Sequence, residues 1–134
     1  MKEINNNIEE RLVSFESAKL LKKAGFDIRR GLMYGTQNIP QLESYNETLF
    51  DLYRDYFLAP TQQVAIDWIR INFGIHIRLD RNWDMWRCEV FRIIGGNKHV
   101  PTGWENYDTP EEAKEEALKY CLTELIHGED GKEN

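Results

Sequence analysis

Every third residue from Phe15 to Ala24 is apolar, which places these side chains along one face of a helix. Ser14 stands before this segment as a residue that can accept hydrogen bonds from free helix amides. Gly25 follows it and can adopt the left-handed conformation that ends a helix. The pattern predicts a helix over 14–24.

Two further segments have helical spacing and recognisable starts. The first begins after Thr61 and ends at Gly74, with its apolar stripe at Val64, Ala65, Trp68 and Ile69. The second begins at Thr109-Pro110-Glu111-Glu112, which places a cap residue, a proline at the first helical position and a glutamate three residues after the cap. Its predicted apolar face is Ala113, Ala117, Leu118, Cys121, Leu122 and Leu125, and it ends at His127-Gly128.

Strict alternation over 75–80 predicts a strand, residues 81–84 a turn, and residues 85–94 a second strand. In the second strand Trp86, Cys88 and Val90 should face inward. Gly95-Gly96-Asn97-Lys98 is typical of a hairpin turn and should lead into a short strand ending near Trp104. The predicted core is Trp68, Ile75, Ile77, Leu79, Trp86, Cys88, Val90, Ala117, Leu118 and Cys121.

Residues 26–58 have a weaker pattern, broken by Gly31, Gly35 and Asn38-Ile39-Pro40. It favours a short strand at 32–34. Residues 49–58 are apolar and aromatic without a clean period, and we interpret them as a strand, with a short helix as the alternative.

These elements predict one α+β domain over 1–134, with residues 1–12 and 128–134 frayed. The expected fold is a small antiparallel sheet of three or more strands covered on one face by helices. Its helix-strand-strand-strand-helix core spans 61–126, and the N-terminal helix packs beside the others or at the sheet edge.

Charge is unevenly distributed along the chain, whose formal net charge is −6. Residues 105–134 carry ten acidic side chains against three lysines, whereas the preceding residues are close to neutral. No apolar run approaches the ~20 residues of a transmembrane helix, and the N-terminus lacks the apolar stretch of a signal peptide. We therefore expect a cytoplasmic protein without a membrane partner.

The sequence offers little catalytic chemistry. Cys88 and Cys121 are isolated and should be buried, reduced thiols, and the three histidines have no metal-site spacing. His127 is explained by the dipole at a helix end. The glutamates 111, 112, 115 and 116 are interpreted as a solvated helix face. We expect no enzyme, no metal and no cofactor, with a nucleophilic Cys88 as the minor alternative.

The element order of 61–126 is similar to that of the double-stranded-RNA-binding domain. In that family the last helix begins with lysines that contact phosphates. Here the matching residues are Pro110-Glu111-Glu112-Ala113-Lys114-Glu115-Glu116, which would repel them. The likeness therefore favours the fold and not the function.

Three parts of the chain resemble a group of small uncharacterised proteins of phages and mobile elements of gut bacteria. They are residues 14–26, then Leu58-Ala59-Pro60-Thr61-Gln62-Gln63 with Trp68-Ile69-Arg70, and then residues 107–125. Residues 27–57 depart from that group. The resemblance implies an accessory role and no activity, cofactor or site residue.

Three function classes stay open. The favoured one is a non-enzymatic accessory or protein-binding protein, whose partner is an unidentified protein or a second copy of the chain. Its expected contact surface combines the outward residues of the sheet with a turn-tip tryptophan: His76, Arg78, Trp83, Arg87, Glu89 and Phe91. The alternative interpretation of this surface is ordinary solvated strand residues. The second function class is nucleic-acid binding through Arg78, Arg87 and Phe91 with Arg81, Arg92 and Lys98, which the overall acidity disfavours, and the third is an unrecognised enzyme.

Overall fold

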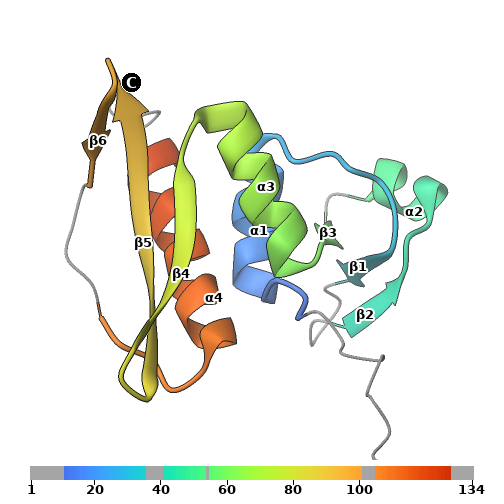
Figure 1. The fold of residues 1–134 in the computed structure, drawn as a ribbon. Helices are drawn as coiled ribbons and strands as arrows, with labels where there is room; N and C mark the ends of the chain where they lie inside the picture. Colours follow the sequence, from blue (N-terminus) through green and yellow to red (C-terminus); the bar gives the residue numbers. More distant parts are fainter. Residues whose placement is uncertain (1–10, 36–40, 54, 101–104, 128–134) are drawn as a thin grey trace, which may run out of the picture.

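The computed structural model describes residues 11–35, 41–53, 55–100 and 105–127. Across them the chain forms four α-helices, a closing π-helical segment and two three-stranded antiparallel sheets, so the α+β class is confirmed (Figure 1). The elements are α1 Phe15–Ala24, β1 Leu32–Gly35, β2 Gln41–Ser44, α2 Glu47–Leu52, β3 Tyr56–Ala59, α3 Gln62–Phe73, β4 His76–Asn82, β5 Met85–Ile94, β6 Asn97–His99, α4 Pro110–Tyr120 and η1 Cys121–Ile126.

The three predicted helices begin at the predicted caps. The side chains of Ser14, Thr61 and Thr109 each accept a hydrogen bond from the backbone N–H three residues later, at 3.1, 3.2 and 3.1 Å. Gly25 ends α1 with a φ of 102°, a conformation that a side chain would disfavour. The last helix continues beyond α4 as η1, up to His127.

The predicted sheet is present with the strand order β4-β5-β6, and residues 61–126 follow the predicted αβββα element order. The turn between β4 and β5 is shorter than predicted, because Arg81 and Asn82 belong to β4. Only Trp83 and Asp84 form the turn, which pairs Asn82 with Met85 and fixes the register of the whole hairpin. The predicted end of the third strand near Trp104 lies outside the described residues.

A second sheet, of order β2-β1-β3, was not predicted as a sheet. Its middle strand is the predicted strand at 32–34. The predicted strand at 49–58 is wrong in its first part, where residues 47–52 form α2. Asn46 caps this helix by accepting a hydrogen bond from the N–H of Leu49, which the local apolar pattern did not indicate. Only the end of the segment is a strand, β3.

The helices lie between and beside the two sheets. Helix α4 packs against β4 and β5, α3 packs against β4 and α4, and α1 contacts β3, α4 and η1 (Figure 1). One hydrophobic core runs through all of them, with Val13, Leu21, Met33, Ile69 and Leu122 among its fully buried members. Of the predicted core residues, Trp68, Ile77, Leu79 and Trp86 are only partly buried and pack at its margin.

The start of the described chain is attached to the entry of α3. The N–H of Gln62 donates to the carbonyl of Arg11 at 2.8 Å, and the N–H of Val13 donates to the carbonyl of Pro60 at 2.9 Å. Arg11 and Leu12, expected to fray, are therefore paired, whereas the rest of the termini expected to fray lies outside the described residues. No helix in the described ranges is long and apolar enough to cross a membrane.

Candidate functional site

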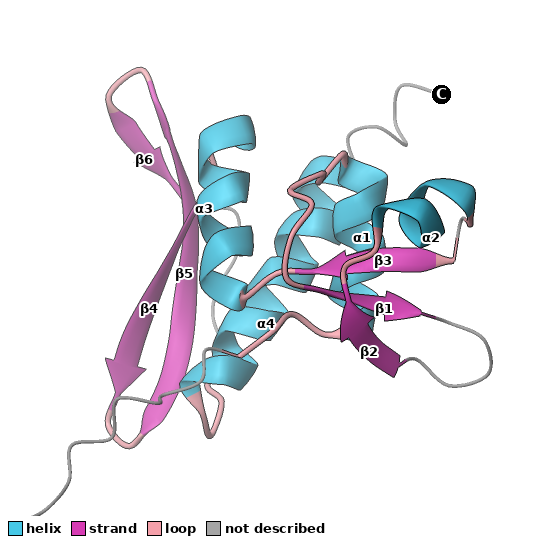
Figure 2. Cartoon of the chain, turned by 90° about the vertical axis from the view of Figure 1, so that its right-hand side faces the viewer, coloured by secondary structure: helices cyan, strands magenta, loops and turns pink. Residues whose placement is uncertain are grey.

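The candidate surface is the side of the β4-β5-β6 sheet that faces away from the helices. Figure 2 shows α3 and α4 on one side of this sheet and no described element against the other. Alternation along the strands gives this outer face its residues, while Cys88 and Val90 point into the core. We define the outer face as His76, Arg78 and Asp80 of β4, Arg87, Glu89 and Phe91 of β5, and Lys98 of β6.

Cross-strand pairs on the outer face join five of the six predicted residues. His76 lies opposite Phe91, and their rings stack with centroids 4.9 Å apart and planes 9° from parallel. Arg78 lies opposite Glu89 with an N–O distance of 3.1 Å. The carboxylate partner of Arg87 is Asp80, at 3.3 Å, which sequence reasoning left out because it requires the register of the hairpin.

The third strand of the sheet, β6, contributes Lys98 to the outer face. Its ammonium lies 2.7 Å from the same Glu89 oxygen that pairs with Arg78, and 4.8 Å from the centroid of the Phe91 ring. Two cations therefore share one carboxylate. The sequence predicted Lys98 as part of the hairpin turn and as a candidate nucleic-acid contact, whereas the structure places it in β6, opposite Ile93.

Trp83 stands at the tip of the β4-β5 hairpin, apart from the paired residues of the outer face. Its side chain is 91% exposed. Its φ of 60° is the only positive value of a non-glycine residue in the described chain. The guanidinium of Arg81 donates a hydrogen bond to the Trp83 carbonyl at 2.9 Å and also lies over the ring of Trp86. The turn is thus held in a conformation that normally suits glycine.

The opposite end of the same sheet also exposes apolar side chains. Ile93 and Ile94 are more than half exposed, and Val100 is exposed beside them. On the inner side of this end is a hollow of about 270 Å³, lined by Val90, Phe91, Arg92, Ile94, His99, Val100 and Leu125. The outer face is therefore bordered by apolar groups at both ends.

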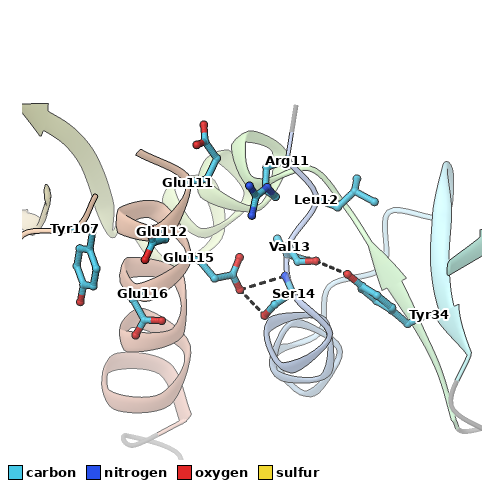
Figure 3. A pocket seen from close by; sticks show the side chains of 10 residues that line it. All are labelled: Arg11, Leu12, Val13, Ser14, Tyr34, Tyr107, Glu111, Glu112, Glu115 and Glu116. Atoms are coloured by element: carbon cyan, nitrogen blue, oxygen red, sulfur yellow. Dashed lines mark hydrogen bonds between the residues drawn. The ribbon is translucent and has the colours of Figure 1, made fainter. Parts of the chain in front are cut away.

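Glu115 is the main exception to the predicted solvated face of α4. Its carboxylate accepts hydrogen bonds from the N–H of Ser14 at 3.1 Å and from the Ser14 hydroxyl (Figure 3). It also accepts from the hydroxyl of Ser17 and from the amide of Gln62, the latter at 3.2 Å. Ser17 and Gln62 are themselves buried. Glu115 therefore ties α4 to α1 and α3, and the interpretation as a solvated side chain is wrong for this residue.

The hollow beside Glu115, of about 340 Å³, is lined by Arg11, Leu12, Val13, Ser14, Tyr34, Tyr107, Glu111, Glu112, Glu115 and Glu116 (Figure 3). Two of its polar side chains hold parts of the fold together: Glu115, and Tyr34, whose hydroxyl donates to the Val13 carbonyl at 2.8 Å. Within the described part of the chain, no three His, Cys, Asp or Glu side chains are placed to hold a metal ion.

The two cysteines and His127 lie in the packed interior or at a contact between helices. Cys88 and Cys121 are buried and unpaired by disulfide. Burial raises the pKa of Cys88 to about 11 and that of Cys121 to about 12, so neither thiol ionises readily near neutral pH. His127 does more than face a helix dipole, because its Nε2 donates to the Leu20 carbonyl at 2.9 Å and joins η1 to α1.

Comparison with known proteins gives no further guide: no family model, curated protein or solved structure matches this chain.

Proposed function

We propose that this chain is a non-enzymatic accessory protein that binds a partner protein through the outer face of the β4-β5-β6 sheet together with Trp83 at the tip of the β4-β5 hairpin, and that Trp83 is the main contact. Its setting in a phage or a mobile element rests on the sequence resemblance alone.

The observation that carries this proposal is the conformation and exposure of Trp83. A left-handed backbone costs a non-glycine residue about 1 kcal/mol, and a tryptophan gains nothing from folding while 91% exposed. Neither local structure nor the core therefore accounts for a tryptophan here. Tryptophan is enriched among the residues that dominate the binding energy of protein interfaces.

The chemistry of the outer face supports a protein partner over the other two classes. The pairing of Arg78 with Glu89 and of Arg87 with Asp80 leaves little unopposed positive charge for phosphates. The nucleophile considered from the sequence, Cys88, is buried with a raised pKa. Arginine and aromatic side chains, which the outer face combines in Arg78, Arg87 and Phe91, are enriched in protein contact surfaces.

The test is a quantitative pull-down from a lysate of the organism that carries the gene, using the full chain, Trp83→Gly and Ile71→Ala. Glycine suits the positive φ, so Trp83→Gly should fold normally, as circular dichroism would check. Ile71 is a matched control, because it is an apolar side chain on α3 that is 70% exposed.

We expect proteins that the wild type and Ile71→Ala capture equally and that Trp83→Gly captures about thirtyfold less, the scale of one interface hot spot. Equal capture by all three proteins would overturn the proposal. Loss of the captured set after nuclease treatment would favour the nucleic-acid class instead.

A further inference from the structure

The outer edge of β6 has no paired strand within the described ranges. The other edge of β6 pairs with β5. All three of its residues are exposed. An unpaired edge of this kind can accept an extended segment through backbone hydrogen bonds.

The hairpin geometry determines which backbone groups the edge presents. Gly95 and Gly96 both have positive φ, 59° and 82°, as a two-residue type I′ turn requires. In such a hairpin the flanking residues, here Ile94 and Asn97, exchange hydrogen bonds, and the pairs then alternate. The N–H and C=O of Lys98 therefore point away from β5, toward the open edge.

The two sides of this edge have different chemistry. On the outer face, Arg78 and Lys98 share the single carboxylate of Glu89, which leaves one positive charge in excess. On the inner side, the hollow is lined by the apolar side chains of Val90, Ile94, Val100 and Leu125 together with Arg92 and His99. A strand added to β6 would thus meet a cation on one face and, on the other, a hollow with mostly apolar lining residues.

We propose that the edge of β6 binds an extended segment of the partner protein in which acidic residues facing Lys98 alternate with apolar residues facing the hollow. This inference rests on the proposed function and names its partner's chemistry. A second copy of the chain fits less well, because a two-fold β6 pair centred on Lys98 places two lysines opposite each other.

The test uses the full chain and two labelled octapeptides, one alternating valine with glutamate and the other valine with lysine, in a fluorescence anisotropy titration. We expect the glutamate peptide to bind about fivefold more tightly, which is the effect of one cross-strand charge pair. Lys98→Gln should abolish this preference for the glutamate peptide but retain the backbone groups through which β6 binds either peptide. Lys98→Pro removes an outward N–H without breaking the β5–β6 ladder, and should abolish binding of both peptides.

Failure of the wild type to bind the glutamate peptide, or unchanged binding by Lys98→Pro, would overturn the inference. A dimer in analytical ultracentrifugation that Lys98→Pro dissociates would overturn it in favour of a second copy. The pull-down separates the two proposals: partner capture that requires Trp83 but survives Lys98→Pro would leave the proposed function standing and reject the β6 edge.

Discussion

The side chain of Glu115 on α4 forms hydrogen bonds that join α4 to two other helices, α1 and α3. Its acceptors serve the N-terminal end of α1, through Ser14 and Ser17, and the first residue of α3, through Gln62. Hydrogen bonds to a charged group are stronger than those between neutral groups, and a buried donor left without its acceptor carries a desolvation penalty.

We predict that Glu115→Ala lowers the free energy of unfolding by about 2–3 kcal/mol, because it leaves the donors of Ser17 and Gln62 without their carboxylate acceptor. Glu116→Ala is the matched control on the same helix. Its side chain is 46% exposed and forms a surface ion pair with Lys119, so its loss should change the stability by less than about 0.5 kcal/mol. Urea denaturation of both variants decides this; equal effects would show that the Glu115 contacts add no more than a surface ion pair.

The sequence could not have distinguished Glu115 from its neighbours. Glu111, Glu112, Glu115 and Glu116 follow one another at the start of a helix, and capping and solvation account for such acids in general. What separates Glu115 is a contact with residues about 100 positions away. Trp83 is a similar case: the sequence placed it at a turn, but its positive φ depends on the turn having two residues rather than four.

At the level of elements, the local signals in the sequence were sufficient wherever an element carries its own cap and its own apolar period. Helices α1, α3 and α4 begin at Ser14, Thr61 and Thr109 as predicted, and β5 faces its core with Cys88 and Val90 as predicted. Prediction failed in the second sheet. Its strands have four residues each, and β2 is exposed throughout, so no hydrophobic pattern marks it.

For α4 we predict that Thr109→Ala lowers the free energy of unfolding by about 1 kcal/mol, because the N–H of Glu112 loses the side-chain acceptor that caps the helix. Thr123→Ala is a suitable comparison. Its hydroxyl is exposed and bonds only to the Lys119 carbonyl of the same helical segment, so its removal should be nearly neutral. Thermal unfolding of both variants would measure the difference, and a melting temperature that Thr109→Ala leaves unchanged would contradict the capping role.

At the level of the whole molecule, the two sheets depend on contacts that join distant parts of the chain. Helix α1 connects them, since it packs against β3 of one sheet and against α4, which covers the other. The candidate surface has the same origin: alternation identified its outward residues, but the ion pairs Arg78–Glu89–Lys98 and Asp80–Arg87 follow only from the register of three strands. The register converts a set of separate charges into a nearly neutral face.

That neutrality leads to a prediction on nucleic acids. We expect no binding to duplex RNA or DNA tighter than about 10 μM at physiological salt, the range of non-specific contact. The net charge is −6, and on the outer face Glu89 and Asp80 oppose Arg78, Arg87 and Lys98. The first turn of α4 contains Glu111 and Glu112, whose negative charge would repel phosphates.

A fluorescence anisotropy titration with a duplex and a single strand, at low and at physiological salt, tests this directly. The single strand belongs in the experiment because the stacked rings of His76 and Phe91 offer a surface on which bases could stack beside Arg78. Phosphate contacts would appear as a steep loss of affinity with salt, and each lost contact would reduce that slope by about 1. A submicromolar dissociation constant with such a slope, abolished by Arg78→Ala and Arg87→Ala, would mean that the cross-strand carboxylates release their cations to phosphate, and the protein-partner proposal would then be wrong.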